Sequence, residues 1–126
     1  MRAARRVLVV DDDDSIRDFI AMALSDNGYE VATAPDGAAA LRVLDAFQPE
    51  LILLDMRMPA MDGWAFSRVH SRSRHSHVPV VVITAARDAG ASAAEIQADA
   101  FLAKPFELQE LLALVGRLLQ RPDGPG

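Results

Sequence analysis

The stretch VLVVDDDDSIRDF, residues 7–19, joins an apolar run to four consecutive aspartates and then to an amphipathic segment. The run Val7–Val10 is aliphatic and β-branched, which is typical of a strand buried on both faces. From Ile16 to Leu24 apolar residues recur at the spacing of one helix face, and Gly28 follows as a stop. The stretch therefore predicts a buried strand, a polar connection and a helix.

The four aspartates, Asp11 to Asp14, stand where that strand would end. Like charges at this spacing repel, and each carboxyl group binds a proton more readily than it would alone. A helix cap accounts for Asp13 or Asp14, because a carboxylate at that position accepts backbone N–H groups. Asp11 and Asp12 need another reason, so they are candidates for a binding site.

Strands and helices are predicted to alternate along the rest of the chain. Further strands are predicted at residues 29–34 (YEVATA), 51–55 (LILLD), 78–85 (VPVVVITA) and 100–104 (AFLAK). Helices are predicted at residues 15–28, 36–47, 64–72, 87–98 and 106–120. This alternation predicts a single doubly wound α/β domain, a five-stranded parallel sheet with helices on both faces. The second and fifth strands are the least continuously apolar, so they take the edges and the order is 2-1-3-4-5.

Composition narrows the class of protein. The 126 residues fit one domain, predicted over residues 1–121, with residues 122–126 as a flexible tail or the start of a linker. A net charge of −5 argues against direct nucleic-acid binding by this chain. The sequence has no cysteine and no apolar segment long enough to cross a membrane. We therefore expect a soluble, cytoplasmic domain.

Chemically active residues stand at the predicted carboxyl ends of four strands. They are Asp11 and Asp12, Asp55, Thr84 and Lys104. In doubly wound sheets these ends meet at one rim, and ligands bind where the strand order reverses. Each residue alone has a simpler structural reading, such as a cap or a surface charge. Together they predict a site on that rim.

The residue types indicate the chemistry of this site. Carboxylates without histidine or cysteine favour Mg²⁺. A carboxylate accepts a phosphoryl group when the charge of the transferring group is neutralised. Mg²⁺ and Lys104 would supply positive charge, and Thr84 would donate one hydrogen bond. The crowded aspartates would then be relieved by the divalent ion that they hold.

Four pieces of the sequence, in this order, resemble a known family. VLVVDDDDSIR, LILLDMRMPAMDG, VVVITA and FLAKPF are similar to the motifs of response-regulator receiver domains of two-component signalling, the CheY-like superfamily. The resemblance runs from Val7 to Leu119 and implies the same flavodoxin-like fold. It also implies that Asp55 is the phosphoacceptor. Asp12, Asp55 and the backbone carbonyl of Arg57 would hold Mg²⁺, with Asp11 acting directly or through water.

The resemblance further implies how the signal is passed on. Lys104 would contact a phosphoryl oxygen, and the Lys104–Pro105 peptide would be cis. Thr84 and Phe101 match the family's switch pair, in which the hydroxyl moves toward the phosphate and the ring turns inward. A sensor histidine kinase or a histidine phosphotransfer protein would be the donor. A downstream output domain or protein would bind the face formed by the fourth helix, fifth strand and fifth helix, and a homodimer is possible. Such a protein catalyses its own phosphorylation and dephosphorylation but is not a turnover enzyme.

The chain departs from the family pattern in three places. Phe101 lacks the hydroxyl that tyrosine would carry. The segment between Thr84 and Lys104 is about two residues short of the common pattern and contains Gly90, which predicts a short or mobile fourth helix. Arg57 stands at a position that varies within the family. It either attracts the donor or interacts with the phosphoryl group and alters its lifetime, or it points to solvent, and these interpretations stay open.

Two other functions compete with the receiver interpretation. A receiver-like interaction module would act without phosphorylation. A haloacid-dehalogenase-like phosphatase would use Asp11-x-Asp13, but it would leave Asp55 and Lys104–Pro105 unexplained. The run RVHSRSRHSH, residues 68–77, is interpreted as the solvated end of the third helix and its loop rather than a metal or nucleic-acid patch.

Overall fold

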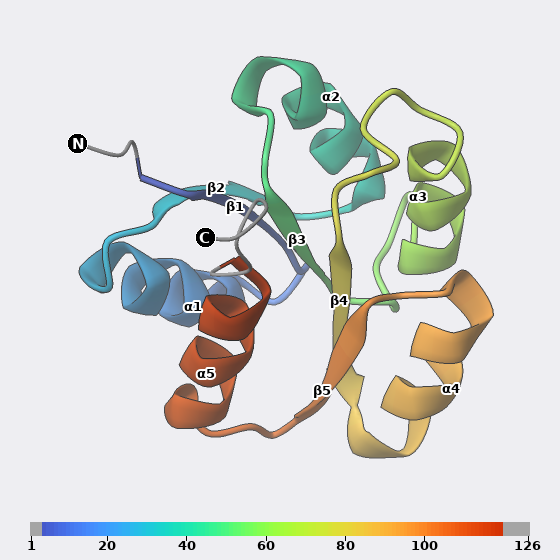
Figure 1. The fold of residues 1–126 in the computed structure, drawn as a ribbon. Helices are drawn as coiled ribbons and strands as arrows, with labels where there is room; N and C mark the ends of the chain where they lie inside the picture. The colour runs from blue at the N-terminus through green and yellow to red at the C-terminus, as the bar shows by residue number, and fades with distance from the viewer. Residues whose placement is uncertain (1–3, 120–126) are drawn as a thin grey trace.

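The fold is an alternation of strands and helices in a computed structural model that describes residues 4–119 (Figure 1). The elements in chain order are β1 (Arg6–Val10), α1 (Asp14–Asp26), β2 (Glu30–Ala34), α2 (Gly37–Phe47), β3 (Leu51–Leu54), α3 (Gly63–His70), β4 (Val80–Ala85), α4 (Ala86–Ile96), β5 (Ala100–Lys104) and α5 (Leu108–Leu119). The predicted end of the domain at residue 121 and the predicted tail at 122–126 lie outside the described residues.

The strands form a parallel sheet in the order β2-β1-β3-β4-β5, which confirms the predicted order. β1, β3 and β4 are central and almost wholly buried. β2 and β5 lie at the edges and are partly exposed. The crevice at the reversal of strand order therefore lies between β1 and β3, whose ends carry the candidate site residues.

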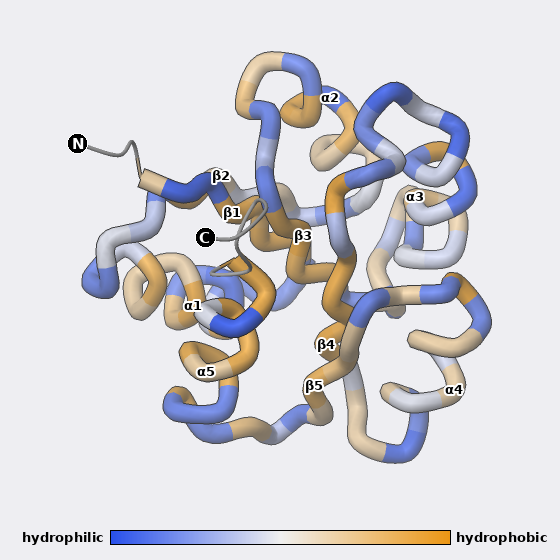
Figure 2. Tube along the Cα trace, in the orientation of Figure 1, coloured by the Kyte–Doolittle hydropathy of each residue, from blue (hydrophilic) through white to orange (hydrophobic). Residues whose placement is uncertain are grey.

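Helices cover both faces of the sheet, with α1 and α5 on one face and α2, α3 and α4 on the other (Figure 1). The strands that they cover are the hydrophobic centre of the molecule (Figure 2). Successive residues of a strand face opposite sides, so each central strand supplies both cores. Val7 and Val9 of β1 pack toward α1 and α5, while Leu8 and Val10 pack toward the other helices. No helix of the described residues is long and apolar enough to cross a membrane.

Aspartate side chains cap the first three helices. Asp13 accepts the backbone N–H of Ile16 at the start of α1, as the sequence predicted for Asp13 or Asp14. Asp36 and Asp62 cap α2 and α3 in the same way. One of the four consecutive aspartates thus has a structural role, because its carboxylate satisfies a backbone donor that the helix leaves unpaired.

Helix α4 corrects the expectation of a short helix. It has 11 residues, as many as α2. Ala89 and Ala93 are buried, and this packing outweighs the conformational cost of Gly90. A Cβ at Gly90 would lie 3.7 Å from the Phe101 ring, so the glycine faces β5. Gln97 ends the helix in the left-handed conformation, with φ of 56°. The predicted mobility of this segment stays a prediction.

Candidate functional site

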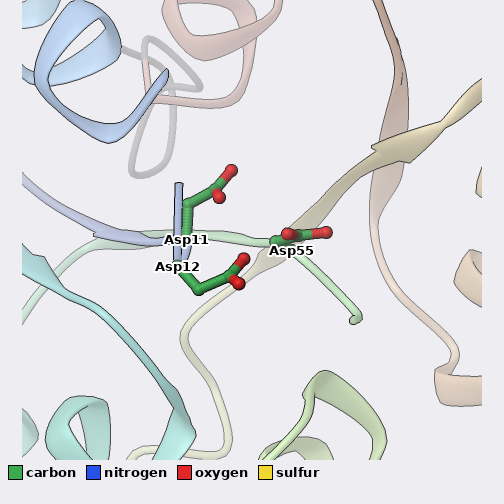
Figure 3. Close-up of side chains that lie close together, drawn as sticks. All are labelled: Asp11, Asp12 and Asp55. Atoms are coloured by element: carbon green, nitrogen blue, oxygen red, sulfur yellow. The ribbon is translucent and has the colours of Figure 1, made fainter. Parts of the chain in front are cut away.

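Three carboxylates gather at the ends of β1 and β3. Asp11, Asp12 and Asp55 each offer an oxygen within 4.8 Å of the other two (Figure 3). Their proximity follows from strand register, because Val10 pairs with Leu54 and the Asp55 N–H donates to the Val10 carbonyl at 2.9 Å. Asp11 and Asp55 are buried, with 2% and 6% exposure, whereas Asp12 is exposed.

Local hydrogen bonds fix two of these carboxylates. Asp11 accepts the Asp13 backbone N–H at 2.9 Å with Oδ1 and the Lys104 ammonium at 2.9 Å with Oδ2. Asp55 accepts the Met56 N–H at 2.8 Å with Oδ1, and its Oδ2 lies 3.5 Å from Lys104 Nζ. The Asp12 carboxylate extends toward Asp55 (Figure 3). The cluster is therefore held from two strands, with one oxygen of Asp55 paired to the backbone and the other beside a cation.

Burial and crowding perturb the ionisation of the site. Burial raises the pKa of the Asp55 carboxyl above its ordinary value, and the charge of Asp11 adds to this against the opposing Lys104 ammonium. Burial opposes the charge of Lys104, but the hydrogen bond to Asp11 and the charge of Asp55 outweigh it and hold its pKa above the ordinary value. Lys104 is thus a cation at neutral pH, and Asp55 lies where added positive charge stabilises its ionised form.

The donor set fits a hard divalent cation. All three side chains offer carboxylate oxygens, two of them are buried, and the Lys104 ammonium that pairs with Asp11 and Asp55 offsets only part of their negative charge. Mg²⁺ binds through one or two carboxylates and keeps several waters, which the exposed side of Asp12 would admit. These residues fit Mg²⁺ better than zinc or copper, which favour imidazole or thiolate ligands.

A cavity of about 590 Å³ opens beside the cluster and brings together Asp55, Thr84 and Lys104. Its apolar wall is made by Ile16, Phe19, Pro105 and Phe106. Thr84 is buried, with 3% exposure, and the Lys104–Pro105 peptide is cis. The structure thus places the predicted strand-end residues on one rim, next to an open cavity.

Phe101 does not line this cavity. Its ring is 52% exposed and lies on β5 against Gly90 of α4. Thr84 and Phe101 are on neighbouring strands, since Val82 pairs with Phe101 and Thr84 pairs with Ala103. The ring is therefore in an outward position, from which an inward turn would change the surface between α4 and β5.

Arg57 lies at the edge of the site, and its side chain is 67% exposed. Its Nε is 3.5 Å from a carboxylate oxygen of Asp88, and its guanidinium lies 5.5 Å from the centre of the Trp64 ring. The Trp64 indole N–H in turn donates to Glu95 at 2.8 Å. The sequence analysis considered Arg57 but did not predict its ion pair with Asp88 or the contact of Trp64 with Glu95, because both acids are on α4, far along the chain.

Gly63 is a residue near the site that the sequence analysis missed. Its N–H donates to the Met56 carbonyl at 2.8 Å, which ties the start of α3 to the residue after Asp55. A Cβ on Gly63 would lie 2.7 Å from Met56 Cα and 2.8 Å from the Asp55 carbonyl oxygen. The glycine therefore permits a close backbone approach that fixes the loop at residues 55–62, called the acceptor loop here because it starts at the predicted phosphoacceptor Asp55. The only sequence signal was its place in the loop motif MDG.

The basic run at residues 68–77 is only partly the solvated surface that was expected. His70 is buried and stacks on Phe66, with ring centroids 5.8 Å apart. His75 is also buried and lies 2.7 Å from an Asp45 oxygen. These two imidazoles are packed inside the protein, so the prediction that they would be exposed to solvent was wrong. Within residues 4–119 the acidic cluster is the sole group of three candidate metal ligands.

We expect Asp55→Asn to raise the free energy of unfolding in metal-free buffer at neutral pH. The folded-state pKa of the Asp55 carboxyl group lies above its unfolded-state pKa. The stability that this group contributes is therefore fully present below the unfolded-state pKa and is lost as pH rises through the folded-state pKa. Asparagine carries no charge, so the advantage of the variant should grow from about pH 4 to pH 7. Urea unfolding at several pH values, with and without Mg²⁺, measures this. An advantage that shrinks as pH rises would contradict it.

The comparisons with known proteins agree on one family. The model of the response regulator receiver domain matches residues 7–116. The chain is 40% identical over 126 residues to "Response regulator MprA" of Mycolicibacterium vanbaalenii, covering 96% of this chain and 54% of the relative. It is 37% identical over 123 residues to "Probable transcriptional regulator ycf27" of Cyanophora paradoxa, covering 96% of this chain and 51% of the relative. The chain thus spans about half the length of the curated relatives that it matches.

Solved structures show the same fold. The chemotaxis protein CheY4 of Vibrio cholerae is 33% identical with a TM-score of 0.81, over 92% of this chain and 99% of that one. The receiver domain of NtrX from Brucella abortus is 35% identical with a TM-score of 0.83, over 92% of this chain and 99% of that one.

Proposed function

The chain belongs to the family of response regulator receiver domains, and on that premise we propose that it is a switch controlled by phosphorylation of Asp55. The observation that carries this proposal is the position of Asp55. It is held between a buried acidic cluster and the Lys104 ammonium, at the mouth of a cavity. Receiver domains are signalling proteins in general, and we propose no turnover reaction for this one.

In the proposed reaction, a carboxylate oxygen of Asp55 attacks the phosphorus of a phosphohistidine. A P–O bond forms, the P–N bond breaks, and the imidazole leaves with the bonding electron pair and takes up a proton. Bound Mg²⁺, held by Asp11, Asp12, Asp55 and the backbone carbonyl of Arg57, would supply positive charge that stabilises the phosphoryl oxygens. Lys104 would contact one of those oxygens, and the 3.5 Å distance from its Nζ to Asp55 Oδ2 supports this role.

Hydrolysis would return the protein to its first state. Water attacks the phosphorus of the acyl phosphate, the bond to the Asp55 oxygen breaks, and inorganic phosphate leaves. The chain would therefore catalyse its own modification and its reversal, which sets the lifetime of a signal rather than the turnover of a substrate.

Thr84 and Phe101 are proposed to transmit the change. The Thr84 hydroxyl is buried at the end of β4 and lines the cavity beside Asp55. Its movement toward a phosphoryl oxygen would leave space into which the exposed Phe101 ring turns. The surface of α4, β5 and α5 would then change and engage an output domain or protein, or a second copy of the chain.

The proposed donor is a sensor histidine kinase or a histidine phosphotransfer protein, and the proposed compartment is the cytoplasm. Two features support a donor that carries a protruding imidazole. The cavity that leads to Asp55 is open to solvent, and its wall is apolar on the side of Ile16 and Phe19. Phe19 is itself 50% exposed, so the rim offers apolar surface to a protein.

The test is phosphorylation by acetyl phosphate, read as intact mass. We expect one phosphoryl adduct that requires Mg²⁺ and is lost in Asp55→Asn. Asp26→Asn, an exposed position in the last turn of α1, makes the same chemical change away from the site and should keep the adduct. The reagent can also acetylate Lys104, the sole lysine of the sequence. An acetyl group adds a different mass from a phosphoryl group, so intact mass distinguishes the two adducts.

Two results would reject the proposal. Absence of an adduct, under conditions that label another receiver domain, would favour an interaction module that works without phosphorylation. Repeated hydrolysis of a generic phosphate ester would favour a phosphatase instead.

A further inference from the structure

A chain of polar contacts links the acceptor loop to α4. Arg57, two residues after Asp55, pairs with Asp88 in the first turn of α4 and lies over the Trp64 ring. Trp64 donates to Glu95, near the other end of the same helix. The proposed switch through Thr84 and Phe101 uses none of these groups. They therefore call for a reason of their own.

Arg57 stands between two cavities that border the site. One, of about 590 Å³, also contains Asp55, Thr84 and Lys104. The other, of about 350 Å³, contains Asp12 and Trp64. The guanidinium is thus a cation that lines the same cavity as Asp55. The Arg57 side chain is 67% exposed, so it is free to change rotamer.

The present partner of Arg57 holds it weakly. The Nε to Oδ2 distance of 3.5 Å is longer than a good charge-assisted hydrogen bond, and solvent screens the pair. A phosphoryl group on Asp55 would add negative charge and three acceptor oxygens in the neighbouring cavity. A guanidinium can donate two parallel N–H groups to such oxygens, whereas Arg57 makes a single weak contact with Asp88.

We propose that Arg57 is a second cationic ligand of the phosphoryl group at Asp55, and that Asp88 withholds it while Asp55 is unmodified. This inference rests on the proposed function of Asp55. Phosphorylation would draw the guanidinium from Asp88 into the acceptor cavity. Asp88 and the Trp64 ring would both lose a cation, so the acceptor loop would release the first turn of α4. Arg57 would thus contact the phosphoryl group directly, beside Lys104, once the group is on Asp55.

The proposal makes opposite predictions for the two partners. The probe is beryllofluoride, a noncovalent phosphoryl analogue, added with saturating Mg²⁺ and followed by ¹⁹F NMR at about 0.15 M salt. Arg57→Ala should weaken its binding about tenfold, as expected for a lost charge-assisted hydrogen bond. Asp88→Asn removes the competitor and should tighten binding about threefold, as expected for a weak exposed pair. In the Arg57→Ala background, Asp88→Asn should have no effect, because Asp88 acts through Arg57.

Each alternative gives a different pattern. If Arg57 merely anchors α4, both single variants lose the same contact and shift binding in the same direction, which would overturn the proposal. If Asp88 repels the analogue directly, Asp88→Asn tightens binding in both backgrounds, which would also overturn it. Arg68→Ala removes an equal charge from an exposed position on α3 and should leave binding unchanged.

Fluorescence of Trp64, the sole tryptophan, gives a second readout. Its emission should change when the analogue draws Arg57 from the ring, and this change should be absent in Arg57→Ala. Failure of the proposed function is distinguishable, because the wild-type protein would then bind no analogue and form no acetyl phosphate adduct. If the wild-type protein binds the analogue and the variants bind it equally well, the role of Arg57 would be rejected while the proposed function of Asp55 would stand.

Discussion

Replacing Lys104 with alanine is expected to slow formation of the phosphoryl adduct about 100-fold, the usual cost of removing one donor to a developing charge. Lys104 Nζ lies 2.9 Å from an Asp11 oxygen and 3.5 Å from an oxygen of Asp55, the proposed phosphoacceptor. It is therefore a cation in direct contact with the reacting carboxylate. The same ammonium competes with Mg²⁺ for the carboxylates. Without it, Mg²⁺ binding should be kept or become tighter while phosphorylation is slowed.

This separation of binding from reaction is the decisive feature of the Lys104 prediction. Mg²⁺ affinity is measured by titration of thermal stability, since an ion that binds the folded state raises its melting temperature. Adduct formation is followed by intact mass over time. Lys104→Arg, which keeps the charge but changes its shape, should recover part of the rate. A loss of Mg²⁺ affinity in Lys104→Ala would instead mean that the lysine organises the acidic cluster.

Gly63→Ala is expected to destabilise the fold by about 3 kcal/mol, at the upper end of the usual cost of overpacking. The added Cβ would meet Met56 Cα at 2.7 Å and the Asp55 carbonyl oxygen at 2.8 Å, and neither backbone atom can move without moving the acceptor loop. The hydrogen bond from Gly63 to the Met56 carbonyl would be strained as well. We therefore expect weaker Mg²⁺ binding together with the loss of stability.

The matched control is Gly116→Ala in α5. A Cβ there would lie 3.9 Å from the Tyr29 hydroxyl, an ordinary contact, and α5 is regular at this position. Because alanine costs less conformational entropy than glycine in a helix, this variant should gain about 0.5–1 kcal/mol. Urea unfolding compares the two. If both substitutions had the same sign, the close approach of Gly63 to the acceptor loop would not limit stability.

Much of the fold and the core of the site could be predicted from the sequence. The continuously apolar segments became the central strands, and the less apolar segments at 29–34 and 100–104 became the edges. Parallel strands end at one edge of the sheet, so residues that follow them meet there whatever their distance in sequence. This is why Asp11, Asp55 and Lys104 could be brought together without coordinates, and the structure places them within hydrogen-bonding or ion-pair distance.

The tertiary structure alone decided which polar groups pair and which small residues tolerate no enlargement. Asp88 and Glu95 face Arg57 and Trp64 because α4 packs beside α3 on the same side of the sheet. The buried positions of His70 and His75 likewise depend on contacts with distant segments, and their local sequence suggested solvent instead.

The division has one physical reason. Strand and helix patterns are local properties of hydrophobic spacing, and the sequence by itself therefore determined the sheet, its order and the residues at its carboxyl edge. The length of α4 despite Gly90, the partner of Arg57 and the fit of Gly63 under the acceptor loop are long-range contacts. Such contacts are set by packing between elements, and packing overrides local preference when enough apolar surface is buried.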